Sequence, residues 1–397
     1  MRILTLHRTV LIASAALLVA ACSSEKSLPA PPQLTPATEA QAEAYGEQLL
    51  EALQTCNPST LRKLFDVEGA QTIALRQSTL NGALQDEFLS EVQRNLSQQT
   101  SQLFQCEDSE YAAGFNFEGI RELDGQPSVV ISNFENGALL WQFPVGTNAE
   151  SAERAVIARD YFNYSQGMLL TAAFTDYDNL VASDVYNRAT VIEVLSALYE
   201  GEPASLERLG ELTKTSRLNR KVQLAELEIR AFLGAEEYKA ARERFYKRFP
   251  NHDPMHLLSQ IALRSAGDEE GALEAIDALD AQIGTIPGLD VLRLRVLEDM
   301  NAPQRLLTVA KRVVRSMPDR ESSWHWLLDA QKRTQDYPGM LATLKEIGER
   351  FDTIWDRTEA DNEFFKEFAA TPYWEAYHGW MGETFELEAD EAPTTAE

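Results

Sequence analysis

The stretch YAAGFNFEGIRELDGQPSVVISNFENGALLWQFPV, residues 111–145, decides the fold of the first half of the chain. Apolar residues alternate with polar ones along it, and the dipeptides Asp124-Gly125 and Asn136-Gly137 interrupt the alternation. Such dipeptides between alternating runs are strong local signals for β-hairpins. The pattern predicts an antiparallel sheet with four strands, at residues 111–117, 128–134, 139–145 and 156–164.

Segments with helical periodicity precede these strands. Apolar residues recur three and four positions apart in residues 39–55, 59–65, 70–80 and 84–99, which predicts helices there. The first folded part, residues 39–180, is therefore expected to be an α+β domain of helices and a four-stranded antiparallel sheet. Within its strands, we expect two sets of residues each to line one face: Tyr111, Ala113, Phe115 and Phe117, and Leu139, Trp141, Phe143 and Val145.

Helices followed by a curved antiparallel meander resemble the α+β roll of nuclear-transport-factor-like and ketosteroid-isomerase-like domains. The segment RDYFNYSQG, residues 159–167, is similar to the last strand of bacterial proteins of this kind. The resemblance implies a pocket, in which an aspartate acts as general base in some relatives. Asp160 is the candidate for a ligand-binding or catalytic carboxylate. The alternative is that its carboxylate hydrogen-bonds the turn backbone at residues 165–167.

The second half of the chain, residues 184–381, has helical periodicity without a strand pattern. Turn residues recur there at intervals of 33, 33, 34 and 34 residues, namely Gly201, Gly234, Gly267, Asn301 and Gln335. This period, with two helices in each unit, resembles the tetratricopeptide repeat. The resemblance implies an all-α superhelix that binds peptides or proteins. A helical bundle without repeats is the alternative.

The end of this helical region is rich in aromatic residues. Five of the six tryptophans lie after residue 320, namely Trp324, Trp326, Trp355, Trp374 and Trp380. Aromatic residues close the open core of a terminal repeat, and they are also enriched at interfaces. We expect a C-terminal cap, with an interface as the alternative. Residues 382–397 are acidic with few apolar side chains, which predicts a disordered tail.

The N-terminus carries the most specific motif of the chain. Residues 1–21 combine an early positive charge with an apolar run, as an export signal does. The run LVAAC, residues 18–22, resembles the lipobox of bacterial lipoproteins, which implies acyl chains such as palmitate on Cys22. Ser23 then implies the outer membrane, and the proline-rich residues 22–38 are expected to be a tether on its periplasmic side. Ordinary cleavage beside an accidental cysteine is the alternative.

Charge and composition exclude several function classes. The 397 residues contain 62 Asp and Glu against 36 Lys and Arg, a net charge of −26, so a nucleic-acid partner is not expected. Neither a CxxC pair nor an HExxH motif occurs, and there is no glycine-rich phosphate loop or GxSxG elbow. His252 and His256 lie four residues apart but have no third metal ligand nearby in the sequence. We therefore expect no metal, no cofactor and no enzymatic reaction.

Cys56 and Cys106 are the remaining cysteines after Cys22. In an oxidising compartment they are expected to form a disulfide that joins the helical layer to the sheet. Two separate buried thiols are the alternative.

These features together favour a lipid-anchored periplasmic scaffold or adaptor. The repeats would bind an unidentified envelope protein, with envelope assembly as the process served, and contact with the membrane would be through lipid alone. A small-molecule-binding or hydrolytic roll that the repeats merely position is the alternative from a different class. A periplasmic helper of a secretion machine is a third hypothesis, and the sequence leaves the oligomeric state open.

Overall fold

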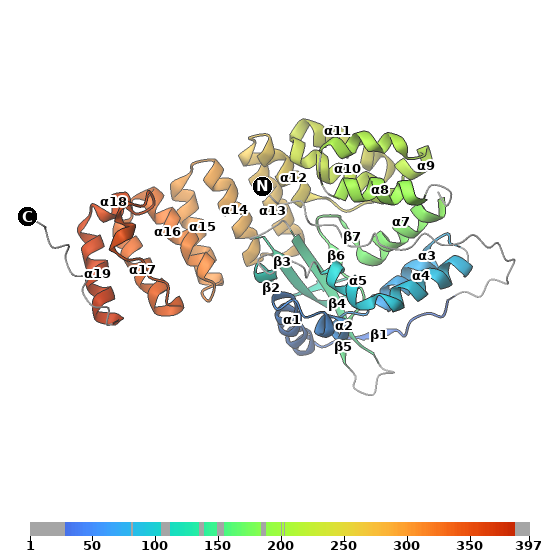
Figure 1. Ribbon diagram of the computed structural model, residues 1–397, viewed down its shortest axis with the longest axis horizontal. Helices are drawn as coiled ribbons and strands as arrows, with labels where there is room; N and C mark the ends of the chain where they lie inside the picture. The colour runs from blue at the N-terminus through green and yellow to red at the C-terminus, as the bar shows by residue number, and fades with distance from the viewer. Residues whose placement is uncertain are drawn as a thin grey trace, which may run out of the picture. The chain divides into compact units, whose positions relative to one another are not determined.

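The computed structural model describes residues 28–80, 82–104, 112–134, 139–148, 155–183, 188–199, 201 and 203–385 (Figure 1). The predicted signal peptide, Cys22, the turn at Asn136-Gly137 and the tail beyond Phe385 lie outside these residues. By its internal contacts the chain divides into two compact units, Met1–Gly288 and Leu289–Glu397. The division falls well after residues 180–184, where the sequence pattern changes from strand to helix.

The first unit contains an antiparallel sheet of seven strands, ordered β2-β3-β4-β6-β7, with β1 and β5 both paired to β4. Asp124 and Gly125 connect β2 to β3, and both have positive φ, as a type I′ hairpin turn requires. The antiparallel meander predicted from the sequence is confirmed. The strands are β1 (Leu34–Pro36), β2 (Asn116–Leu123), β3 (Gln126–Asn133), β4 (Leu139–Asn148), β5 (Val156–Ala158), β6 (Phe162–Asn163) and β7 (Met168–Leu169).

Two predicted strands were wrong in their boundaries. The first begins only at Asn116, because Ala112 and Ala113 are helical and Phe115 packs into the core from outside the sheet. The expected strand over residues 156–164 is divided into β5 and β6, which pair with different parts of β4.

Part of the proline-rich segment that we expected to be a tether belongs to the folded unit. Residues Leu34–Pro36 form β1, and Leu28 and Ala37 are buried. A Cβ on Gly146 of β4 would lie 2.7 Å from the Thr35 carbonyl oxygen, so a glycine there permits the close pairing. The structure thus shortens the possible tether to residues before Leu28.

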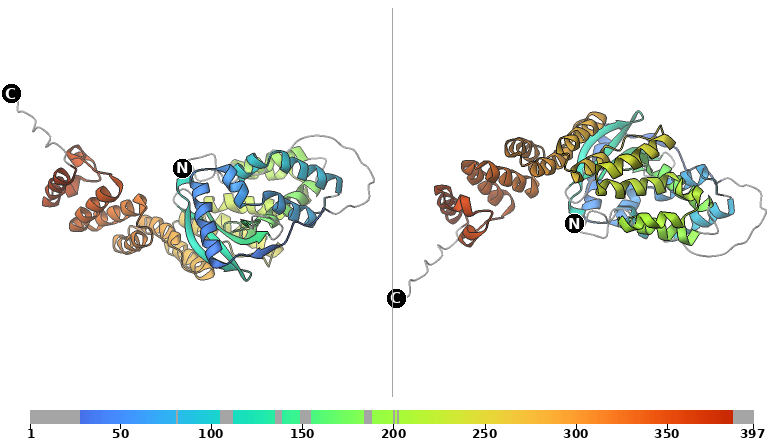
Figure 2. Two further views of the ribbon diagram at one scale, coloured as in Figure 1. Left: turned by 90° about the horizontal axis from the view of Figure 1, so that it is seen from below. Right: turned by 90° about the horizontal axis from the view of Figure 1, so that it is seen from above.

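The helices of the first unit cover the sheet and extend beyond it. α1 contacts β2 and β3, and the left view in Figure 2 shows it alongside the strands. The helices are α1 (Glu39–Gln54), α2 (Pro58–Leu64), α3 (Val67–Gln77), α4 (Gly82–Arg94), α5 (Leu96–Leu103), α7 (Leu170–Ser183), α8 (Arg188–Tyr199), η2 (Pro203–Glu211), α9 (Lys214–Arg217), α10 (Arg220–Leu233), α11 (Ala235–Arg248), α12 (His256–Ser265) and α13 (Glu269–Ile283).

The core of the sheet region is aromatic. The expected face of β4, formed by Leu139, Trp141, Phe143 and Val145, is buried in one cluster with side chains of α1, α2 and α3. Ring centroids in this cluster lie between 5.1 and 6.3 Å apart. The rings belong to Phe65, Phe104, Phe115, Trp141, Phe143 and Tyr161.

The second unit, by itself, is a succession of helices. α15 contacts α16, α16 contacts α17, and α17 contacts α19, as Figure 2 also shows. α14 begins two residues before the unit boundary. The helices are α14 (Pro287–Asp299), α15 (Pro303–Ser316), α16 (Glu321–Thr334), α17 (Tyr337–Phe351), η3 (Arg357–Asp361), α18 (Lys366–Ala369) and α19 (Pro372–Thr384).

Candidate functional site

Asp160 lies between β5 and β6 and binds the N-terminus of α7. Its Oδ1 accepts hydrogen bonds from the Thr171 amide at 3.1 Å and from the Tyr161 amide at 2.9 Å, and its Oδ2 accepts one from the Thr171 hydroxyl. The first N–H groups of a helix have no partner within the helix, so a carboxylate there stabilises it. Burial raises the pKa of Asp160 to about 6, and the hydrogen bonds from Thr171 oppose that rise.

This arrangement differs from both interpretations of Asp160 that the sequence suggested. The carboxylate accepts hydrogen bonds from backbone amides, as the second interpretation predicted. The amides belong to residues 161 and 171, however, and not to residues 165–167. Both carboxylate oxygens are engaged in these bonds, and the ring of Tyr161 belongs to the packed aromatic core. Asp160 therefore has a structural role: its hydrogen bonds hold the first turn of α7 against the sheet.

The structure brings together a second acidic site, which sequence reasoning missed. Asp178, on α7, is fully buried, and the amide of Gln71 on α3 donates to its two oxygens at 3.2 and 3.4 Å. Burial raises the pKa of Asp178 to about 8, against the opposing effects of the Gln71 hydrogen bond and the Lys221 charge. A buried carboxylate held by one amide is therefore protonated more readily than an ordinary aspartate.

Lys221 on α10 is the charged group that acts on Asp178, and it interacts with further carboxylates of α7 and α10. Burial lowers the pKa of Lys221, while the charges of Asp176, Glu228 and Asp178 oppose that change. Asp176 forms an ion pair with Arg220 at 2.6 Å. The sequence holds a usable signal for this site, because Asp178 interrupts the apolar spacing of Phe174 and Val181, both of which are buried.

The predicted turn residues share a positive φ. Gly201, Gly234, Gly267, Asn301 and Gln335 all have positive φ, between 49° and 115°. At the last three, the turn has the hydrogen bonds of a Schellman motif, in which an amide after the helix binds a carbonyl five residues earlier. These bonds run from Asp268 to Leu263 at 2.9 Å, from Ala302 to Leu297 at 3.1 Å, and from Asp336 to Gln331 at 2.9 Å.

The helices that follow two of these turns begin in the same way. Asp268 accepts a hydrogen bond from the Gly271 amide at 3.0 Å, and Asp336 accepts one from the Gly339 amide at 3.1 Å. A Cβ on either glycine would lie within 2.6 Å of the capping carboxylate. Glycine three residues after the aspartate therefore lets the carboxylate approach the helix closely.

An ion pair joins the two helices in two of the helix pairs. Glu226 on α10 contacts Arg244 on α11 at 2.9 Å, and Asp290 on α14 contacts Arg312 on α15 at 2.8 Å. In each case the carboxylate precedes the turn, and the arginine follows it by about three helical turns. An ion pair between a carboxylate before the turn and an arginine after it therefore occurs in two of the helix pairs.

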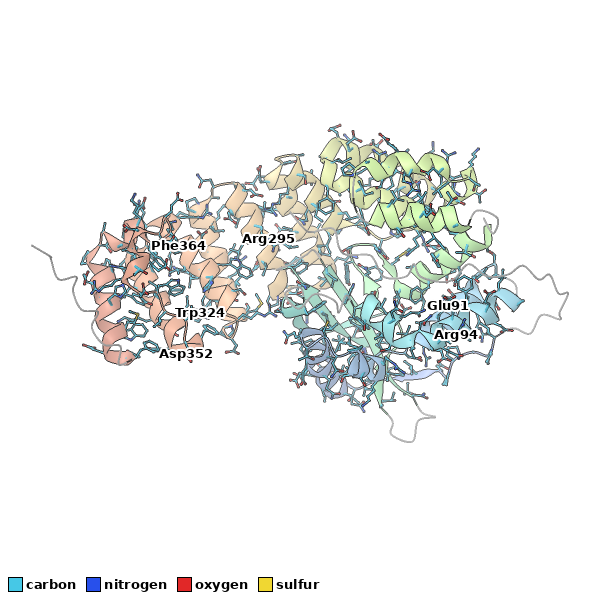
Figure 3. All side chains as sticks on the ribbon, in the orientation of Figure 1. Glu91, Arg94, Arg295, Trp324, Asp352 and Phe364 are labelled. Atoms are coloured by element: carbon cyan, nitrogen blue, oxygen red, sulfur yellow. The ribbon has the colours of Figure 1, made fainter. Side chains whose placement is uncertain are left out.

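The aromatic end of the chain is largely internal to the second unit. Phe365, Phe368, Trp374 and Tyr377 are buried, and their rings contact one another. Lys332 of α16 lies over the ring of Phe364, which Figure 3 labels, with 4.5 Å between the ammonium nitrogen and the centroid. These contacts favour the interpretation of the segment as a terminal cap over that of an open interface.

Trp326 on α16 differs from the other five tryptophans. Its neighbour Trp324 is buried, donates to the Pro318 carbonyl at 2.8 Å and packs against Arg350. Trp326 is half-exposed, and among the described residues it takes part in no hydrogen bond, ring contact or cation–π contact. On the same helix face, Asp329 binds Arg333, which also binds Glu298 of α14, both at 2.6 Å. Tryptophan and arginine are both enriched at protein interfaces.

The two histidines separate in the structure. The Nε2 atom of His252 lies 2.7 Å from the Gln166 carbonyl oxygen, which ties the loop before α12 to the turn between β6 and β7. Burial lowers the pKa of both His252 and His256. Over the described part of the chain, no group of three or more His, Cys, Asp or Glu side chains is arranged to hold a metal ion.

The other predicted site residues are described only in part. Cys56 follows α1 with a φ of 49°, whereas Cys106 lies outside the described residues, so their pairing stays a prediction. Cys22 also lies outside them. None of the helices in the described ranges has the length and hydropathy needed to cross a bilayer.

Comparison with known proteins gives no guide to function. No protein-family model, curated protein or solved structure matches the chain.

Proposed function

We propose that this chain is a lipid-anchored periplasmic scaffold or adaptor whose tetratricopeptide-like helix pairs bind a protein partner. Cys22 would carry the acyl chains and hold the protein at the outer membrane, and a disulfide between Cys56 and Cys106 would brace the sheet region. The partner would bind to the helices of the second unit. Envelope assembly is a process that such an adaptor would serve.

One observation carries the repeat part of the proposal. Turns with equivalent hydrogen bonds recur at Gly267, Asn301 and Gln335, at intervals of 34 residues. A helix pair cannot bury its apolar stripe alone, and stacking of equivalent pairs creates an extended surface on which partners bind. Such arrays serve mainly in recognition, so a protein partner follows more directly than a reaction.

The surface that best fits a partner lies on α16, around Trp326. Tryptophan and arginine are the residues most enriched among those that dominate binding energies. Trp326 is available for contact, and the ion pairs of Arg333 with Asp329 and Glu298 hold its surroundings in place. We therefore assign the central contact with the partner to Trp326.

The alternative, a ligand-binding or hydrolytic roll, has less support. A general base requires access to a substrate and a second group that stabilises the developing negative charge. Asp160 instead caps α7, and the interior beside it consists of packed aromatic rings. Asp178 is buried where α3, α7 and α10 meet, and its hydrogen bond with Gln71 contributes to the packing of α3 against α7.

The decisive experiment compares two variants of the full chain in detergent extracts of envelopes. Partners cross-linked to the protein are quantified for the wild type, for Trp326→Ala and for Leu233→Ala. Leu233 is a matched control, because it is an exposed large apolar residue on the end of α10 in the other unit. Loss of an interface hot spot costs about 2 kcal/mol or more, so Trp326→Ala should recover about thirtyfold less partner.

Three results would contradict the proposal. Equal recovery with Trp326→Ala and wild type would remove the assigned surface. Equal loss with both variants would indicate a general effect of apolar exposure. Absence of any specific protein, together with a co-purified small molecule that Asp160→Asn releases, would favour the alternative function. Independently, a Cys22→Ser variant that remains in the membrane fraction would refute the lipid anchor.

A further inference from the structure

His378, on α19, is a buried histidine whose ring nitrogens make no hydrogen bond. The residue is 7% exposed, and among the described residues neither Nδ1 nor Nε2 has a hydrogen-bond partner. Buried polar groups in folded proteins are nearly always hydrogen-bonded, so such an exception requires an explanation. The second unit has one other histidine, His325, whose side chain is 48% exposed and lies 3.4 Å from Glu321.

The ring of His378 packs against two aromatic rings of the same helix. Its centroid lies 4.4 Å from that of Trp374 and 5.2 Å from that of Tyr377, and both pairs meet edge to face. Trp374 and Tyr377 are themselves buried. A neutral imidazole packs well among such rings, whereas a buried imidazolium loses its hydration, and no hydrogen bond with the described residues compensates.

Three charged groups act on His378. Arg357, at the start of η3, donates to both carboxylate oxygens of Glu375 on α19 at 2.9 Å each. Asp356 caps η3 by accepting a hydrogen bond from the Thr358 amide at 2.8 Å. Burial lowers the pKa of His378 and the charge of Arg357 lowers it further, while the charges of Glu375 and Asp356 oppose these effects. The folded site therefore disfavours the protonated imidazole.

The helices packed against α19 present charged groups as well, but these contact other side chains. Lys345 of α17 lies over the ring of Trp380, 5.6 Å from its centroid. Glu367 of α18 lies 3.4 Å from the hydroxyl oxygen of Tyr337. Neither group shifts the pKa of His378. Burial and the three charges described above therefore decide its protonation.

Side chains next to His378 dock α19 to its surroundings. The Tyr377 hydroxyl accepts a hydrogen bond from the Trp355 amide at 3.1 Å. Trp380 packs so closely on α17 that a Cβ on Gly348 would lie 2.8 Å from its ring. Since α19 contacts both α17 and α18, a positive charge on His378 would arise inside the contact that holds this helix in place.

We propose that α19 is a cap released by acid, in which uptake of a proton by His378 detaches the helix from α17 and α18. The rings of Phe365 and Phe368, which contact Trp374 in the docked helix, then become accessible. In a detached helix the imidazole has an ordinary pKa of about 6.5. Because the pKa in the docked helix is lower, the detached helix binds more protons as the pH falls below that value. Docking is therefore strongest at neutral pH and weakens toward low pH by at most about tenfold per pH unit.

Hydrogen exchange of the intact chain, read out on peptides from single helices, tests this release. Protection of α19, corrected for the intrinsic pH dependence of exchange, should fall at least about fivefold from about pH 7.5 to about pH 5.0. Protection of α15 should change less than about twofold over the same range. Hydrogen bonds from Thr358 and Arg357 lower the pKa of Asp356 and of Glu375, so both carboxylates stay charged throughout.

Substitutions at the two histidines separate their effects. His378→Gln and His378→Phe cannot ionise, and each should reduce the fall in α19 protection to less than about twofold. Gln keeps a polar group and Phe keeps the packing against Trp374, so a common result separates ionisation from packing. His325→Gln is the matched control, because it removes the exposed histidine of the same unit, and it should retain the wild-type fall. Circular dichroism at neutral pH verifies that all three variants are folded.

Four results would overturn the proposal. Constant protection of α19 across the range would mean that the helix stays docked. An undiminished fall in both His378 variants would assign the effect to other groups. Loss of the fall in His325→Gln would assign it to the ring contact between His325 and Trp355. An equal fall in α15 and α19 would indicate unfolding of the whole unit and not release of one helix.

Discussion

Replacement of the buried Asp178 by Asn should change how the stability of the first unit depends on pH. Asn has the shape of a protonated aspartate and cannot ionise, and its amide oxygen can still accept the hydrogen bond from Gln71. The variant therefore removes the ionisable group while it keeps the packing between α3 and α7.

The size of the effect follows from the pKa of Asp178, which burial raises to about 8 from an ordinary value of about 3.9. Between these two values the folded chain holds a proton that the unfolded chain has released. The free energy of unfolding therefore falls as the pH rises through this window, by at most about 1.4 kcal/mol per pH unit, and becomes constant above pH 8. From pH 5 to pH 7 the wild type should lose about 1–3 kcal/mol relative to Asp178→Asn.

Urea unfolding at several pH values measures this difference. Hydrogen exchange of peptides from α3, α7 and α10 shows whether it arises in these helices. Asp176→Asn is the control, because it removes the ion pair with Arg220 and should lower stability where Asp178→Asn raises it. A stability difference between Asp178→Asn and wild type that stays within about 0.5 kcal/mol from pH 5 to pH 7 would refute the reasoning.

Three further changes test the other structural assignments. Asp160→Ala should destabilise α7 by about 2 kcal/mol, with the fastest hydrogen exchange around Thr171. Asp160→Asn should lower the stability less, because one hydrogen-bond acceptor remains. Equal losses of stability in the two variants would disprove the capping role. Gln335→Gly should raise the free energy of unfolding of the second unit by about 0.5–1 kcal/mol, because a residue with a side chain is strained at a φ of 57°. A thermal unfolding midpoint that does not rise would contradict this prediction. Trp374→Ala should cost about 3–5 kcal/mol and expose α19 to limited proteolysis, and a resistant α19 would mean that the aromatic segment is not a cap.

Local patterns in the sequence were sufficient for several elements. The turn at Asp124-Gly125 and the buried face of β4 follow from residues that are adjacent along the chain, because hairpin register and side-chain alternation are short-range properties. The left-handed turns at Gly267 and Asn301 could likewise be located by spacing alone. The identity of the residue and its distance from the next turn contain this information.

Other features depend on residues that are far apart in the sequence. Leu34–Pro36 becomes a strand only because β4 offers it an edge more than a hundred residues later. Asp160 finds its partner at Thr171 instead of in its own turn, because α7 begins where the carboxylate points.

By itself the sequence determined the alternating strands, the helical segments and the excess of acid, and it predicts an export signal at the N-terminus. The tertiary structure alone decided that Asp178 and Gln71 meet, that the helices up to α13 belong to one unit with the sheet, and that Trp326 differs from its neighbour Trp324. The physical reason is that burial and long-range contact are properties of packing. A pattern of residues fixes which face of an element is apolar, but the surrounding elements decide which polar groups are buried there and what they bind.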